Sequence, residues 1–204
     1  MRPVRACSKT AGRETVMTAN ALTMSRLLLT VPIVALMHVN GPAAAWTALG
    51  LFLLAMLTDV FDGPLARRDP NRSPLGSYLD PVADKVLLMS LFICLAAGGV
   101  VPAWMVVVLV AREFVVSGVR SAGAMQGRLV GANWMGKTKT LLQTFAIGFA
   151  LGGGAMAVSG AESTGAVFLR LAWWTTLVVT VAATVFAAVF VRWNWSILRG
   201  VRAD

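Results

Sequence analysis

Long apolar stretches alternate with short polar segments along this chain. Six of the stretches are each about long enough, alone or with tilt, to cross a hydrocarbon layer of about 30 Å as a helix. They lie near residues 21–38, 44–60, 83–100, 101–119, 138–158 and 168–191. None of them alternates polar and apolar positions, as membrane β-strands of about ten residues do. The pattern therefore predicts an all-α, polytopic membrane bundle of about six transmembrane helices.

The composition supports this prediction. Hydrophobic residues make up 57% of the 204 positions, whereas soluble domains typically hold about 45–50%. The chain has no internal repeat and no linker long enough to divide it, so we expect one membrane domain over residues 17–204. Residues 1–16 are polar and are expected to form a disordered tail. Both Met1 and Met17 remain open as the natural first residue.

The net charge of +9 raises the question of a nucleic-acid partner, but the positions of the basic residues argue against one. The loops around Asn40, Gly98 and Gly160 hold no Lys or Arg. The basic residues gather instead in the tail, between the second and third stretches, between the fourth and fifth, and at the C-terminus (Arg2, Arg5, Lys9, Arg13; Arg67, Arg68, Arg72; Arg120, Arg128, Lys137, Lys139; Arg192, Arg199, Arg202). This positive-inside pattern predicts a multi-pass protein of the inner or plasma membrane with both termini in the cytoplasm.

Four carboxylates stand at the ends of the second and third apolar stretches: Asp59, Asp62, Asp80 and Asp84. Residues three or four apart share one face of a helix, so each pair would present two carboxylates together, and a turn between the helices could bring all four together. An ionised Asp in hydrocarbon costs about 2.5–3.5 kcal/mol on insertion scales, so such groups usually face a cavity or a counter-ion. Clustered carboxylate oxygens favour a hard divalent cation, Mg²⁺ or Mn²⁺. For either pair alone, helix capping and solvated loop charges are the alternative.

The acids belong to a longer frame, D-x-x-D-G-x-x-A-R, eight residues, G-x-x-x-D-x-x-x-D. Every fixed position is filled, by Asp59, Asp62, Gly63, Ala66, Arg67, Gly76, Asp80 and Asp84. The frame resembles the signature of the CDP-alcohol phosphatidyltransferases, membrane enzymes that move a phosphatidyl group from a CDP-lipid to an alcohol. A non-catalytic membrane scaffold or transporter, with the acids lining an ion path, is the alternative from another class.

The resemblance implies roles for individual residues. Asp59, Asp62 and Asp80 would hold the metal, two ions of Mg²⁺ or Mn²⁺, and Asp84 would take the proton of the acceptor hydroxyl and also touch the second ion. In the first stretch an N-x-x-T-x-x-R pattern adds to the nucleotide site. The implied residues that bind the CDP-lipid are Asn20, Thr23, Arg26, Asp59, Gly63, Arg67, Ser73 and Gly76.

The second half of the chain bears on the acceptor alcohol. The runs A-R-E-F from Ala111, S-G-V-R from Ser117 and W-M-G-K-T-K-T from Trp134 resemble the phosphatidylglycerophosphate synthases within the family. With the acidic frame, the resemblance covers most of residues 17–192. It implies transfer from CDP-diacylglycerol to glycerol-3-phosphate, giving phosphatidylglycerophosphate and CMP in phospholipid biosynthesis, by a homodimer. Cardiolipin synthase and phosphatidylinositol-phosphate synthase of the same fold remain alternatives.

A phosphate dianion at a low-dielectric site needs cationic partners. Our hypothesis is that four basic residues form the pocket for the acceptor phosphate beside Asp84: Arg112, Arg120, Lys137 and Lys139. The alternative is structural: Arg112 pairs with Glu113 or with an Asp of the frame, and the others only satisfy the positive-inside bias.

Overall fold

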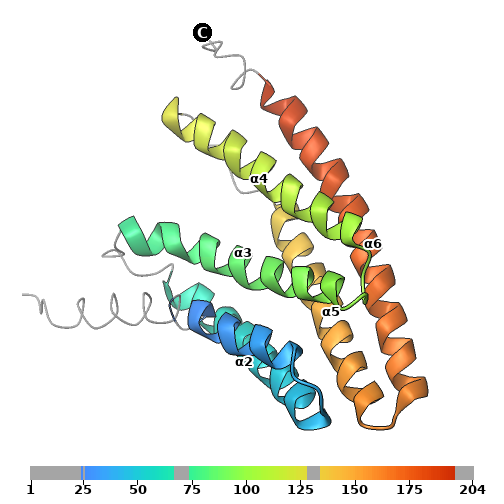
Figure 1. The fold of residues 1–204 in the computed structure, drawn as a ribbon. Helices are drawn as coiled ribbons and strands as arrows, with labels where there is room; N and C mark the ends of the chain where they lie inside the picture. Colours follow the sequence, from blue (N-terminus) through green and yellow to red (C-terminus); the bar gives the residue numbers. More distant parts are fainter. Residues whose placement is uncertain (1–23, 25, 67–73, 128–133, 196–204) are drawn as a thin grey trace, which may run out of the picture. The chain divides into compact units, whose positions relative to one another are not determined.

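A computed structural model describes residue 24 and residues 26–66, 74–127 and 134–195; the side chains of 59–66, 74–82, 84 and 134–137 are not part of that description. The described residues contain helices and no strand (Figure 1). The helices are Arg26–Met37, α2 (Pro42–Ala66), α3 (Pro74–Ala97), α4 (Ala103–Met125), α5 (Trp134–Val158) and α6 (Glu162–Trp193). Each of the six predicted stretches overlaps one of these helices, so the all-α prediction is confirmed.

The chain groups into two compact units, Met1–Ser90 and Leu91–Asp204. In the first unit, helix Arg26–Met37 is followed by a short turn and then by α2. Gly41 lies in this turn with φ +133°, a conformation that side-chain-bearing residues rarely adopt. On α2, Ala48, Phe52 and Ala55 are buried at intervals of four and three residues, as expected for one apolar face of a helix. The hydrophobic pattern therefore accounts for the way this helix packs.

Glycine ends both α3 and α5. After α3, Gly99 has φ +72° and the amide of Val100 donates to the carbonyl of Leu95 at 2.9 Å. After α5, Gly160 has φ +90° and the amide of Ala161 donates to the carbonyl of Met156 at 3.0 Å. These are Schellman endings, in which a left-handed residue closes the helix and satisfies one of its last carbonyl groups. They explain why two of the loops without basic residues are short and rich in glycine.

In the second unit, α5 and α6 form an antiparallel hairpin, and α4 packs against α6 (Figure 1). The two hairpin helices meet at glycines. A Cβ atom on Gly153 would lie 2.9 Å from Cγ of Leu169, and a Cβ atom on Gly165 would lie 2.8 Å from the amide nitrogen of Ala157. Small residues allow helix backbones to approach this closely. One turn before Gly153, Phe149 packs edge-on against Phe168 of α6, with ring centroids 5.9 Å apart.

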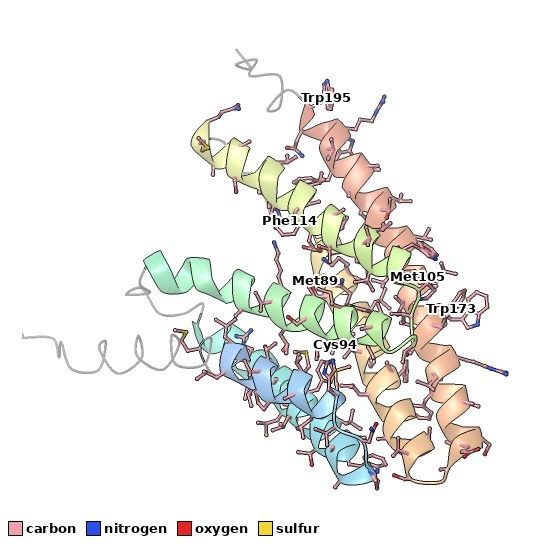
Figure 2. The ribbon with its side chains drawn as sticks, in the orientation of Figure 1. Met89, Cys94, Met105, Phe114, Trp173 and Trp195 are labelled. Carbon is pink, nitrogen blue, oxygen red and sulfur yellow. The ribbon has the colours of Figure 1, made fainter. Side chains whose placement is uncertain are left out.

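Among the described residues, two segments are long and apolar enough to cross a membrane: Thr138–Val158 and Glu162–Trp193. The length of the second segment can be compared with the thickness of a bilayer. Between Arg170 and Arg192 this segment holds no charged residue. The interval rises roughly 30 Å along a helix, which is close to the hydrocarbon thickness. Figure 2 shows Trp173 pointing outward near one end of the interval and Trp195 beyond the other end. Tryptophans favour both membrane interfaces, so α6 has the features of a helix that spans a bilayer.

Candidate functional site

The four acidic residues lie in two helices of the first unit. Asp59 and Asp62 belong to the last two turns of α2, and Asp80 and Asp84 belong to the first half of α3. Both pairs therefore have helical backbone, as the hypothesis of a shared face requires. Only residues 67–73 connect the two helices, and such a segment reaches at most about 3.5 Å per residue. The chain path therefore limits how far apart the two helix ends can lie but does not bring the acids together, and the four carboxylates fall outside the described side chains.

The other residues predicted to bind the CDP-lipid are placed in part. Arg26 lies in the first helix and is buried, with 3% of its surface exposed. Its carbonyl accepts a hydrogen bond of 2.9 Å from the Thr30 hydroxyl. Gly63 lies in α2 and Gly76 in α3. The remaining predicted residues lie outside the described part of the chain: Asn20, Thr23, Arg67 and Ser73.

A cluster of buried charges joins α4 to α5 in the second unit. The carboxylate of Glu113 forms ion pairs with its neighbour Arg112 and with Lys139 of α5. Glu113 and Lys139 are each only 8% exposed. Charges this deeply buried are tolerated when they are paired, and breaking such a pair leaves an uncompensated charge. The structural role that sequence reasoning left open for Arg112 is therefore observed, and Lys139 shares it.

Arg112 also binds the third helix of this unit. Its Nε donates a hydrogen bond of 3.1 Å to the main-chain carbonyl of Ala183 in α6. Ala183 lies inside the uncharged interval of α6, whereas Lys139 lies at the start of the apolar segment Thr138–Val158, so the charge cluster extends from the end of one apolar segment into the interior of another. Ionisable residues within apolar segments of membrane proteins are rare and usually mark a functional site.

The other two predicted phosphate ligands differ from this pair. Arg120, two turns after Arg112 on α4, is exposed, and its guanidinium carbon lies 5.7 Å from the ring centroid of Phe190. A cation over an aromatic face at this distance is weakly stabilised but keeps its N–H donors available. Lys137 belongs to the first turn of α5, and its side chain is outside the described set. Of the four basic residues, Arg120 is therefore the one whose described surroundings leave it open to a ligand.

Sequence reasoning missed Gln143. This residue of α5 is 1% exposed, and its Nε2 has no hydrogen-bond partner among the residues that the structure describes. The buried hydroxyls of α6 differ, because Thr176 and Thr180 donate to the carbonyls of Ala172 and Thr176, both at 2.7 Å. The available signal was its position four residues after Lys139, which places both on one face of the helix.

The family comparison agrees with the acidic frame. The sequence profile of the CDP-alcohol phosphatidyltransferases matches residues 16–185. The chain therefore belongs to the CDP-alcohol phosphatidyltransferase family, and it is a membrane protein.

The names of individual relatives are more specific than the name of the family. A CDP-diacylglycerol–glycerol-3-phosphate 3-phosphatidyltransferase of Bacillus subtilis is 42% identical over 106 residues, which cover 52% of this chain and 55% of the relative. A probable phosphatidylglycerophosphate synthase of Mycobacterium tuberculosis is 40% identical over 64% of this chain and 63% of its own length. A Rickettsia typhi protein with the same name as the Bacillus one is 32% identical over 74% of this chain and 82% of its own length. The matched region thus spans little more than half of the Bacillus relative.

Proposed function

We propose that this chain transfers the phosphatidyl group of CDP-diacylglycerol to glycerol-3-phosphate and releases CMP and phosphatidylglycerophosphate. The observation that carries the proposal is the complete acidic frame on α2 and α3, within a family match over residues 16–185. The relatives named for this reaction support the choice of acceptor. The active site would face the cytoplasm, because the basic residues follow the positive-inside pattern.

The acidic residues fit a divalent metal by their chemistry. Four carboxylates on two helices offer only hard oxygen donors, which Mg²⁺ and Mn²⁺ prefer. Asp59, Asp62 and Asp80 would hold the metal, as two ions, with Asp84 beside the second. When bound, the ions would neutralise the diphosphate of the CDP-lipid and so favour the departure of CMP. Gly63 and Gly76, which lack a Cβ atom, would let backbone approach the nucleotide closely.

Asp84 would act as the general base. It accepts the proton of the acceptor hydroxyl while the hydroxyl oxygen forms a bond to the phosphorus that carries the diacylglycerol. The bond from that phosphorus to the bridging oxygen breaks, and CMP leaves with the bridging oxygen. Atoms and charges balance without an oxidant or a further reactant. Asn20, Thr23, Arg26, Arg67 and Ser73 would hold the CDP-lipid in position for this exchange.

The acceptor phosphate would be bound by the basic residues of α4 and α5. Arg120 and Lys137 would supply direct charge-assisted hydrogen bonds. Arg112 and Lys139 would contribute positive charge to the surroundings of the phosphate while they remain paired with Glu113. This division of roles rests on the exposure of Arg120 and on the burial of the Glu113 cluster.

An acceptor panel tests the proposal. The purified full chain in lipid nanodiscs is given CDP-diacylglycerol and Mg²⁺ or Mn²⁺, with glycerol-3-phosphate, phosphatidylglycerol, inositol-1-phosphate or serine as the acceptor. CMP release and the lipid product are measured. We expect metal-dependent CMP release with glycerol-3-phosphate only. Product from phosphatidylglycerol alone would identify a cardiolipin synthase, product from inositol phosphate would identify the inositol enzyme, and no release under any metal condition would favour a non-catalytic role.

A further inference from the structure

The starting observation is the amide group of Gln143. Its Nε2 is buried in the second unit and has no hydrogen-bond partner within the described part of the chain. A buried polar group without a partner loses its hydration and gains nothing in return, a cost that native proteins generally avoid. A methionine or leucine would fill a similar volume at no such cost. The presence of glutamine therefore calls for a partner that binds only in the working protein.

The surroundings of Gln143 indicate the chemistry of that partner. Lys139 lies one turn earlier on the same face of α5, and it is buried as well. Lys139 pairs with Glu113, which also pairs with Arg112. The amide donor thus lies one helical turn from a cation of this charge cluster. An N–H donor close to cationic side chains favours a ligand rich in anionic oxygen.

We infer that Gln143 is part of the binding site for the acceptor and donates a hydrogen bond from Nε2 to an oxygen of its phosphate ester. The inference deepens the proposed function and rests on it. The ligand class is a small phosphorylated polyol bound in the second unit, at the face of α5 that carries Lys139 and Gln143. Gln143 would select for a phosphorylated acceptor because, without one, its amide stays buried and unsatisfied.

Two substitutions separate binding from structure. Gln143→Met and Gln143→Leu remove the amide and leave an apolar side chain of similar size. If the amide serves the ligand, both variants keep or raise the melting temperature of the protein without ligand, because a desolvated polar group has been removed. The KM for glycerol-3-phosphate rises about tenfold or more, the loss expected for one hydrogen bond to a charged group. The KM for CDP-diacylglycerol stays unchanged.

A matched control comes from α6. Thr176 is also fully buried, but its hydroxyl already donates to the carbonyl of Ala172. Thr176→Val should leave both KM values unchanged. A second readout needs no turnover: glycerol-3-phosphate should raise the melting temperature of the wild-type protein and raise it much less in Gln143→Met.

The outcomes are distinct. A wild-type protein that releases CMP with glycerol-3-phosphate, together with an unchanged acceptor KM in both Gln143 variants, overturns the inference and leaves the proposed function intact. The inference also fails if both KM values rise equally, since Gln143 would then support the fold and not the acceptor. A wild-type protein with no activity toward glycerol-3-phosphate rejects the proposed function, and the inference with it.

Discussion

Gly153 of α5 and Gly165 of α6 lie so close together that a Cβ atom on Gly165 would stand 2.8 Å from the carbonyl oxygen of Gly153. The same Cβ atom would be 2.8 Å from the amide nitrogen of Ala157. Both neighbours are backbone atoms, which cannot rotate away as a flexible side chain can. Gly165→Ala should therefore force the helices apart and lower the stability of the hairpin by about 1–3 kcal/mol, measured as a fall in melting temperature in detergent.

Gly154 provides the control for this substitution. It lies next to Gly153 on α5, yet a Cβ atom there would meet nothing within 4 Å. Gly154→Ala should be neutral or slightly stabilising, because alanine favours a helix over glycine by about 1 kcal/mol. Equal losses of stability in both variants would mean that the close backbone approach at Gly165 is not the cause of the loss.

The ion pairs of Glu113 predict a second effect on stability. Glu113→Gln removes the negative charge that Arg112 and Lys139 share in the interior of the second unit. Breaking a buried pair in this way typically costs about 3–5 kcal/mol. We expect a large fall in melting temperature. Glu162→Gln, at the exposed first turn of α6, should change it far less.

A double substitution tests whether the effect is electrostatic. If Glu113→Gln destabilises because Lys139 loses this carboxylate partner, then Lys139→Met should restore part of the lost stability in the double variant. Additive losses would show that the two residues act independently and would reject the pair as the cause.

The acidic residues predict a loss of activity without a loss of fold. Asp84→Asn removes the proposed base and should lower turnover by about 10²–10⁴-fold, while membrane insertion and melting temperature are retained. Asp59→Asn, Asp62→Asn and Asp80→Asn should also abolish metal-dependent CMP release. Asp69→Asn is the matched control, since Asp69 occupies a variable position between the two halves of the frame. Near wild-type turnover in Asp84→Asn would refute the assignment of the base.

Substitution of Arg120 should weaken the binding of one substrate and not of the other. Arg120→Gln removes a cation proposed to bind the acceptor phosphate, so the KM for glycerol-3-phosphate should rise about tenfold or more and the KM for CDP-diacylglycerol should not. Phe190→Leu is the control, because it removes the ring under the guanidinium and keeps the charge. If Phe190→Leu has the same effect as Arg120→Gln, the contact between α4 and α6 is what matters, and the direct role of Arg120 is rejected.

The basic residues also predict an orientation in the membrane. Ser159, in the exposed turn between α5 and α6, should lie outside the cytoplasm. In a background lacking Cys7 and Cys94, Ser159→Cys should react with a membrane-impermeant thiol reagent added to intact cells. Labelling that requires opened cells would reverse the predicted topology.

The sequence predicted the helices well because hydrophobic runs, glycine turns and charge placement all act locally. The six predicted stretches each overlap a helix, yet the boundaries differ: α2 continues past residue 60 to Ala66, and α3 begins at Pro74 and not near residue 83. The spacing of the acids already indicated helical backbone at these ends, but an apolar criterion ends each stretch where polar residues begin, although a helix can continue through them. The number of spans that cross the membrane and the orientation stay predictions.

Less of the candidate site than of the helices could be predicted from the sequence. The spacing of Asp59, Asp62, Asp80 and Asp84 identified the motif, because it is local. The role of Glu113 as the shared partner of Arg112 and Lys139 depends on how α4 and α5 pack, which no spacing rule specifies. Gln143 was missed for the same reason, because only the structure shows that this single glutamine in an apolar run is buried.

The hydrogen bond from Arg112 to Ala183 has a consequence for how this protein varies among its relatives. Its acceptor is a main-chain carbonyl, which every residue type supplies. Position 183 can therefore change its side chain without breaking the link, provided that the substituted side chain still fits its buried position. The contact should leave no paired pattern of substitution between positions 112 and 183. Methods that infer contacts from co-varying positions would miss this connection between α4 and α6, and only the loss of the arginine itself would reveal it.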